Sequence, residues 1–99
     1  MPVFKIARYE IRPEARSQVE RAIQEFAEYV RTELPDSSWI TYRDAKNRNA
    51  YVSLIAADNP AADERHRNSP GTKRFVEALY PNVVGSVEFV DYELVAGSK

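Results

Sequence analysis

Four segments of the chain combine β-branched and aromatic residues with interleaved polar residues, a pattern typical of strands. They cover residues 3–11, 39–43, 51–57 and 83–95. The second and third are joined by residues 44–50 (DAKNRNA), a polar stretch that suits the turn of a hairpin. The sequence therefore predicts four strands, of which the middle two form a hairpin.

Apolar residues recur at helical spacing between the first two strands. The repeat, with steps of four, three and four, consists of Val19, Ile23, Phe26 and Val30. Such spacing places the four side chains on one stripe of an amphipathic helix. Pro13 suits the first helical position, and Pro35 disfavours helix in the residue before it. We expect this helix to run from Pro13 to about Leu34.

A second helical region follows the third strand and is interrupted by a proline. Asp58 or Asn59 can cap a helix that begins at the next proline, and Ser69 can cap another in the same way. We therefore expect two short helices, at residues 60–68 and 70–79.

The order of these elements, strand, helix, strand, strand, helix, strand, predicts a ferredoxin-like α+β fold. Such a fold has one four-stranded antiparallel sheet with its helices on one face. The third strand, however, is apolar on both faces: Tyr51 and Ile55 share one parity, and Val52, Leu54 and Ala56 the other. Helices can cover only one of these faces. We therefore predict a homodimer packed sheet against sheet, a dimeric α+β barrel.

The composition fits one small domain spanning residues 1–99. A monomer of this length buries only about 60 to 65% of its unfolded surface, so burial of further surface against a partner subunit would add to its stability. Lys and Arg number 14 and Asp and Glu 15, with the signs mixed along the chain. That balance argues against a nucleic-acid or anionic-membrane partner. The first residues resemble no signal or anchor, and no run approaches the roughly 20 apolar residues of a membrane span. We expect a cytoplasmic protein.

The residue types that the chain lacks limit the cofactors and metals that it can bind. It has no cysteine and one histidine, which excludes disulfides, thiolate chemistry and Cys-ligated metals. A metal site with several histidines could form only between two subunits. No glycine-rich loop suits a flavin or nicotinamide. We therefore expect no cofactor and no metal.

The single histidine, His66, lies on the expected helix of residues 60–68. It follows Ala62 by one turn and precedes Ser69 by one turn, so a stripe of small residues contains it and is expected to face the sheet. One interpretation makes His66 a base in a pocket between helices and sheet. The other makes it a half-buried packing residue that donates to a backbone carbonyl near the helix break.

Several other polar and aromatic side chains are candidates by their parity in the strands. Trp39 and Tyr42 point to opposite faces, one toward the helices and one toward a partner. Tyr51 and Ser53 share a face and could place hydroxyl groups in a cavity, although Ser53 could equally serve only to leave room.

Two further polar positions each allow two interpretations. Arg8 shares a face with Glu10 on the first strand, so it is either a clamp for a substrate anion or half of an interface salt bridge, which we favour. Asn68 and Ser69 suit the capping of the helix break, with a role in the pocket as the alternative.

Three segments of the sequence resemble those of a known family. The stretch AADNPAADERHRNSP, the helix TKRFVEAL and the last strand VEFVDYELV are similar to those of the antibiotic biosynthesis monooxygenase superfamily. The resemblance implies a dimeric α+β barrel, and activities that include cofactor-free oxygenation of polyphenols and quinols and degradation of haem. It also implies that His66, the Ser-Pro break and Phe75 belong to the site. Our candidates are His66 for catalysis and, for substrate binding, Trp39, Tyr51, Ser53, Asn68 and Phe75.

The chain departs from the better-marked branches of that family at three places. Ala56-Ala57 stands where a tryptophan is common, the first strand lacks the asparagine of the haem branch, and Gly71 replaces a second histidine. Haem degradation is therefore not expected. The leading hypothesis is a cofactor-independent monooxygenase of an electron-rich aromatic, a quinol or polyketide phenol. The alternatives are a non-catalytic dimeric barrel that binds a small molecule, and an oxygen-independent lyase or isomerase that uses the same pocket.

Overall fold

The computed structural model describes residues 1–98 and contains the expected order of strands and helices. The strands are β1 (Val3–Ile11), β2 (Ser37–Arg43), β3 (Ala50–Ala57) and β4 (Val83–Tyr92). The helices are α1 (Arg16–Glu33), α2 (Pro60–Asn68) and α3 (Pro70–Leu79), and short 3-10 turns cover Pro13–Ala15 and Tyr80–Asn82. The predicted break between α2 and α3 is confirmed: the side chains of Asn59 and Ser69 cap the two helices.

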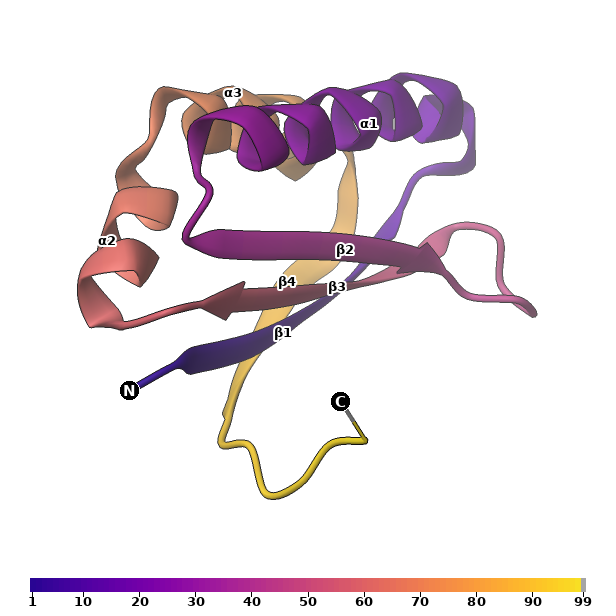
Figure 1. The fold of residues 1–99 in the computed structure, drawn as a ribbon. Helices are drawn as coiled ribbons and strands as arrows, with labels where there is room; N and C mark the ends of the chain where they lie inside the picture. The colour runs from indigo at the N-terminus through magenta and orange to yellow at the C-terminus, as the bar shows by residue number, and fades with distance from the viewer. Residues whose placement is uncertain (99) are drawn as a thin grey trace.

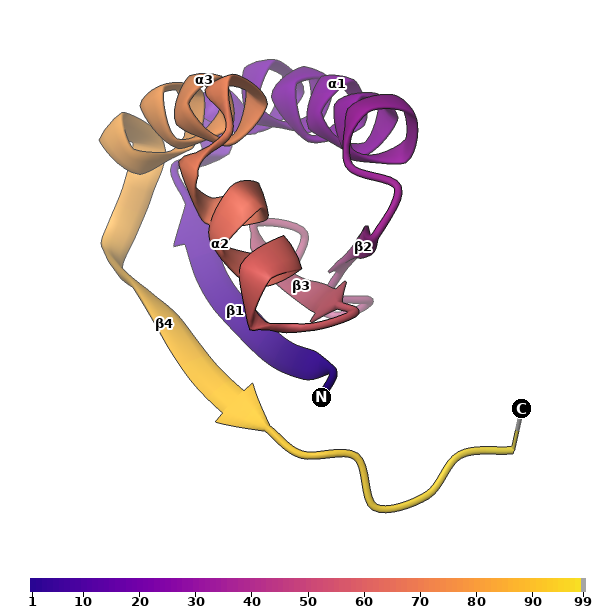
Figure 2. The ribbon, with the colours of Figure 1, turned by 60° about the vertical axis from the view of Figure 1, so that its left-hand side comes forward.

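The strands form one antiparallel sheet in the order β2-β3-β1-β4, with α1 and α3 lying side by side over one face (Figure 1). In Figure 2, α2 connects the end of β3 to α3 along the side of this layer. The ferredoxin-like fold is thus confirmed. The last strand was predicted too long, because it ends at Tyr92 rather than Val95. Tyr92 pairs with Phe4, near the start of β1, so residues 93–98 have no neighbouring strand.

The space between helices and sheet is filled largely by aromatic rings. Phe26 of α1 stacks on Phe75 of α3 with centroids 4.9 Å apart and planes at 5°. Trp39 of β2 meets the rings of Phe26 and Phe75 edge-on, at 4.8 and 5.2 Å. All three side chains are buried. This cluster joins both long helices to the sheet and fixes one wall of the cavity described below.

The other face of the sheet, here called the outer face, carries a row of aliphatic side chains that crosses all four strands. The strand register aligns Ile40, Leu54, Ile6 and Val90. Leu54 is 37% exposed, and Ile40 and Val90 are 48% and 45% exposed. Tyr42 also lies on this face, opposite to Trp39, as predicted. No helix within residues 1–98 covers the outer face (Figures 1 and 2).

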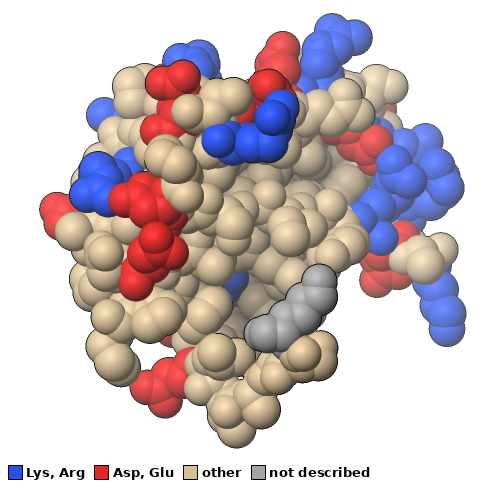
Figure 3. Space-filling model, in the orientation of Figure 1, with Lys and Arg blue, Asp and Glu red and all other residues tan. Residues whose placement is uncertain are grey.

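Many of the charged side chains lie away from this aliphatic row. Figure 3 shows them gathered over the helices and around the β2–β3 hairpin, whereas the middle of that view is uncharged. None of the helices within residues 1–98 is long and apolar enough to cross a lipid bilayer.

Gly71, at the start of α3, allows α1 and α3 to approach closely. A Cβ atom built on Gly71 would lie 2.3 Å from ring carbons of Tyr29. The Tyr29 ring is held in turn between Phe26, with which it stacks, and the guanidinium of Arg74. A histidine at position 71 would therefore collide with Tyr29.

We expect Gly71→Ala to lower the free energy of unfolding by about 1 to 3 kcal/mol, because the whole Tyr29 ring must move. Gly97→Ala is the matched control, since a Cβ at Gly97 meets nothing within 4 Å. Chemical denaturation of both variants measures the difference. Equal stability of the two variants would contradict the role assigned to Gly71.

Candidate functional site

A cavity of about 350 Å³ lies between the sheet and the helices α2 and α3. It exists because the central row of the sheet's inner face consists of small side chains, Ser53 and Ala7, flanked by Thr41 and Phe89. Its apolar lining includes Phe26, Trp39, Ile55, Phe75, Val76, Leu79, Val87 and Phe89. Its polar lining includes Lys5, Tyr9, Ser53, Asp63, His66, Arg67 and Thr72. A cavity of this size and character suits a small aromatic molecule.

His66 faces this cavity with only 5% of its surface exposed. Its Nδ1 atom lies 3.3 Å from the hydroxyl of Ser37, which itself donates to the carbonyl of Leu34. In the tautomer with the proton on Nδ1, Nδ1–H donates to Ser37, whose own proton goes to the carbonyl of Leu34, and Nε2 keeps its lone pair. Nε2 has no hydrogen-bond partner within residues 1–98, and it keeps some accessible surface. In this tautomer His66 lines the cavity with Nε2 free to accept a proton.

The electrostatic surroundings keep this imidazole neutral. Burial lowers the pKa of His66 below its ordinary value of 6.5, and Lys5 adds to this effect. Asp63 acts in the opposite direction but does not reverse the shift. The Phe26 ring packs edge-on against the imidazole at 5.6 Å and fixes its orientation. A neutral, oriented imidazole with a free lone pair is the form that a general base requires.

Beside His66, a charged group is built into the cavity wall. Asp63, one turn before His66 on α2 and only 6% exposed, accepts from Lys5 of β1 at 3.2 Å. The same carboxylate oxygen accepts from Arg67 at 3.1 Å. Two cations thus share one carboxylate, so this part of the wall has a formal charge of +1.

Three hydroxyl groups form a second polar area on the sheet side. Ser53 Oγ lies 3.1 Å from the hydroxyl of Tyr9 and 2.7 Å from that of Thr41. Burial raises the pKa of Tyr9, which keeps its phenol protonated. Three hydroxyl protons meet only two mutual hydrogen bonds, and none of the three donates elsewhere within the described chain. One proton of the three is therefore left without a partner in the described chain, and a ligand oxygen can accept it where Tyr9 or Ser53, the two members that line the cavity, carries it.

Four of the six predicted site residues meet around this cavity: His66, Trp39, Ser53 and Phe75. Asn68 does not, because it lies on the exposed side of α2, and the cap at the helix break is formed by Ser69 alone. His66 is more deeply buried than the half-buried packing interpretation expected. Its Nδ1 bonds to a side chain and not to a backbone carbonyl, so that interpretation is wrong in its detail.

Tyr51 also lies outside the cavity, although it shares the inner face with Ser53 as predicted. Its hydroxyl donates to Glu20 of α1 at 2.6 Å, which raises the pKa of Tyr51, already raised by burial, to about 12. Arg43 binds the same carboxylate with two nitrogens, at 2.7 and 2.8 Å. These bonds lower the pKa of Glu20 to about 2. Tyr51 therefore joins α1 to the sheet, and its ring supports Tyr9 from a centroid distance of 5.7 Å.

We expect Glu20→Gln to destabilise the fold by about 1 kcal/mol at neutral pH, a modest value because the pair is partly exposed. The lowered pKa of Glu20 means that its stabilising effect is complete above its ordinary value of 4.5 and is lost as pH falls toward about 2. Unfolding midpoints of both proteins should therefore differ at pH 7 and converge near pH 2. A gap that stays constant across this range would contradict the ion-pair explanation.

Lys5, Tyr9 and Asp63 are among the polar cavity residues that were not predicted. Lys5 and Tyr9 have the parity of the buried residues Ala7 and Ile11 in the first strand, and this signal could have located them on the inner face. Asp63 had no comparable signal, because an acidic residue near a helix start is usually a solvated one.

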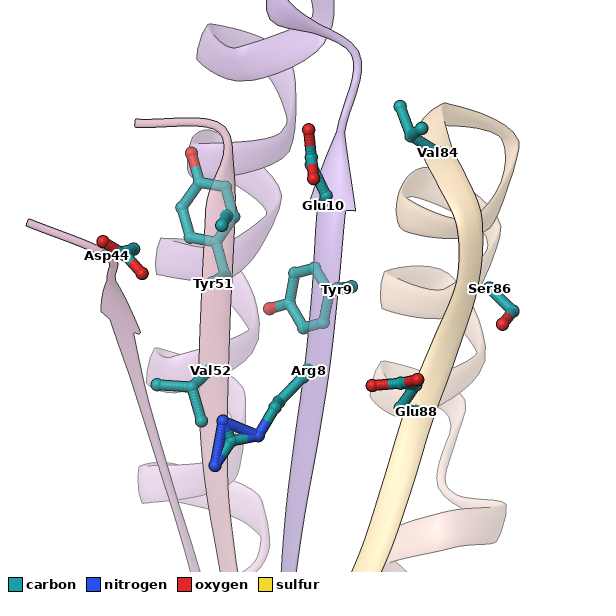
Figure 4. Close-up of a pocket in the computed structure, with 10 residues that line it drawn as sticks. Arg8, Tyr9, Glu10, Asp44, Tyr51, Val52, Val84, Ser86 and Glu88 are labelled. Atoms are coloured by element: carbon teal, nitrogen blue, oxygen red, sulfur yellow. The ribbon is translucent and has the colours of Figure 1, made fainter. Parts of the chain in front are cut away.

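A second hollow of similar volume, about 350 Å³, lies on the outer face and is more polar. Figure 4 shows Arg8 reaching across β3 toward Val52, with Glu10 farther along β1 and Glu88 on β4. None of the ion pairs within residues 1–98 includes any of these three charged residues. We place the functional site in the inner cavity, because there an apolar lining and a buried imidazole occur together.

The sequence profile described as "Antibiotic biosynthesis monooxygenase" matches residues 2–78. The chain belongs to the antibiotic biosynthesis monooxygenase family. Solved structures agree with this assignment at the level of the fold. A structure described as an antibiotic biosynthesis monooxygenase superposes with a TM-score of 0.87 at 22% identity, over 95% of this chain and 99% of its own.

Two further solved structures have the same fold. Rv0793 from Mycobacterium tuberculosis aligns over all of both chains, with a TM-score of 0.88 and 22% identity. A conserved protein from Methanosarcina mazei Go1 aligns over 93% of this chain and 91% of its own, with a TM-score of 0.85 and 15% identity. No curated protein matches the chain. In this member of the family, the only tryptophan lies in β2, and β3 ends with Ala56-Ala57.

Proposed function

We propose that this family member is a cofactor-independent monooxygenase of an electron-rich aromatic, a quinol or a polyketide phenol. The observation that carries the proposal is the buried His66, which lines a largely apolar cavity, has a lowered pKa and has no hydrogen-bond partner at Nε2 within the described chain. A phenol is the kind of substrate that needs such a base and can itself supply electrons.

In the proposed reaction, Nε2 of His66 accepts the phenolic proton. The resulting anion transfers one electron to dioxygen, and the two radicals combine at a ring carbon. The resulting peroxide anion takes the proton back from His66, and loss of water, which carries away the hydrogen of that ring carbon, leaves a carbonyl group: one oxygen atom of dioxygen enters the product and the other becomes water. The chain contributes the base, the orientation of the ring and a site from which water is excluded.

The cavity contributes to each of these tasks. Trp39, Phe26 and Phe75 form an aromatic wall against which a flat ligand can pack. The spare proton of the Tyr9–Ser53–Thr41 hydroxyl group can bind a second ligand oxygen, which would align the reacting hydroxyl with His66. On this proposal the ligand is an aromatic molecule with at least two oxygen substituents.

A non-catalytic binding barrel would need only a cavity lined by apolar side chains, with no polar groups converging in it. The convergence of His66, Lys5 and Tyr9 on one cavity favours the catalytic proposal. A lyase or isomerase would use the same base, but it would turn over without oxygen.

We also propose that the chain functions as a homodimer joined through the outer face. The aliphatic row Ile40–Leu54–Ile6–Val90 is exposed in a single chain and would be covered by a second copy. Arg8 lies opposite Glu88 in the strand register but forms no ion pair with it, so it is available to a carboxylate of the partner. The chain that follows β4 runs apart from its own sheet (Figure 2), and Leu94 and Val95, both exposed, could contact that partner.

Oxygen consumption by the purified protein tests the proposed reaction. We expect uptake with at least one member of a panel of quinols and anthrone-type phenols, without added flavin, nicotinamide or metal. Conversion of the same compounds under strict anaerobiosis would instead favour a lyase or isomerase. No uptake and no conversion, under conditions in which a positive-control enzyme turns over, would contradict the proposal and favour a binding barrel.

A further inference from the structure

We propose that Lys5, held by Asp63 in the cavity wall, binds the anionic oxygen of a phenolate ligand beside His66. The phenol class of the ligand rests on the proposed function. The assignment of Lys5 rests on the charges and contacts around it.

Lys5 lies on the inner face of the sheet. Its neighbours on the inner face of β1 are Ala7 and Tyr9, both buried, and its partner in β3 is Ile55. A lysine in such a row must direct its ammonium group to a counter-charge or to solvent. The Lys5 side chain is 21% exposed and lines the cavity, so its head group remains within reach of a ligand.

The charges around Asp63 do not balance. Asp63 has one carboxylate for two cations, Lys5 and Arg67, and Oδ2 accepts from both. Asp91 is opposite Lys5 in the register of β4, but it is solvent-exposed and forms no ion pair with Lys5 in the described chain. The inner end of the group therefore keeps an excess positive charge, which an anion in the cavity can satisfy.

The ammonium group of Lys5 also has hydrogen-bond donors that no group in the described chain uses. Lys5 Nζ carries three protons, and its one hydrogen bond within residues 1–98 is to Asp63. Asp63 and His66 are separated by three residues on one face of α2, which places the cation and the imidazole along the same part of the cavity. A phenol that gives its proton to Nε2 thus leaves its negative oxygen close to a fixed positive charge.

The binding of a coloured phenol measures this effect directly. The probe is 4-nitro-1-naphthol, whose ionised form absorbs visible light, and the titration is done anaerobically so that no oxygenation is needed. We expect the bound probe to ionise at lower pH than the free probe. Lys5→Met should weaken the acidity of the bound probe about tenfold, the lower end of the effect of an adjacent opposite charge. Lys5→Arg should preserve most of it.

Lys73→Met is the matched control, because Lys73 is an exposed lysine of α3 outside the cavity, and it should leave the ionisation unchanged. If Lys5→Met does not fold, Arg67→Met tests the same charge group and should shift the ionisation in the same direction, by less.

An unchanged ionisation in folded Lys5→Met, or failure of the wild-type protein to bind the probe, would overturn the inference. A protein that acidifies the probe but never consumes oxygen would contradict the monooxygenase proposal and leave the role of Lys5 intact. Oxygen consumption that is accompanied by unshifted ionisation would contradict only the role of Lys5.

Discussion

Replacing His66 with glutamine should lower the rate of phenol oxygenation by about 10² to 10⁴, the usual contribution of a positioned base. Glutamine is close in length to histidine but cannot accept a proton near neutral pH. We prefer it to alanine, because His66 is 5% exposed and packs on Phe26, so alanine would also leave a cavity in the core. Steady-state rates and thermal unfolding, measured on the same preparations, separate the catalytic effect from the structural one.

The pH dependence gives an independent test of the same role. A base works in its neutral form, so the rate should fall as pH drops through the pKa of His66. Because burial lowers that pKa below 6.5, the wild-type rate should persist to lower pH than an exposed imidazole would allow. Glu64→Gln, an exposed change on the same helix, should alter neither rate nor profile. A rate that survives His66→Gln would remove the proposed base.

The second large effect concerns the outer face. Leu54→Asp should leave a single chain folded but weaken the dimer at least about a hundredfold, because a carboxylate would be buried in the middle of an apolar interface. Leu54 is the centre of the row that runs from Ile40 to Val90, on the face that no helix covers. Sedimentation over a range of micromolar concentrations measures the change.

Gln24→Asp is the control for this variant, since it adds the same charge to an exposed position of α1, on the helical side of the sheet and not on the outer face. Far-ultraviolet circular dichroism verifies that both variants are folded. A wild-type chain that sediments as a monomer, or a Leu54→Asp protein that remains dimeric, would contradict the proposed interface.

The fold could be predicted because its signals are local. Period-two and helical spacing, together with prolines at positions 13, 35, 60 and 70, locate nearly every element. The end of β4 could not be predicted, because Val95 is as apolar as a strand residue. What ends the strand is the position at which β1 begins, and that depends on the register between distant segments.

The candidate site was only partly predictable for a similar reason. Trp39, Ser53, His66 and Phe75 were predicted from parity, helix face and family resemblance. Tyr51 has the same parity as Ser53, but its hydroxyl is bound by Glu20 of a distant helix. The contact of Lys5 with Asp63 spans 58 residues, and no local pattern in the sequence indicates it.

The central claim, that His66 promotes oxygenation of a phenol without a cofactor, is tested most directly by the fate of isotopically labelled dioxygen. The measurement is mass spectrometry of 1,8-dihydroxy-9-anthrone incubated under ¹⁸O₂ with metal-stripped protein, compared with His66→Gln and with buffer alone. We expect protein-dependent formation of the anthraquinone with one labelled oxygen atom, reduced to near the buffer rate in His66→Gln. Product formation that does not exceed the buffer rate, or a new oxygen that comes from water, would contradict this claim.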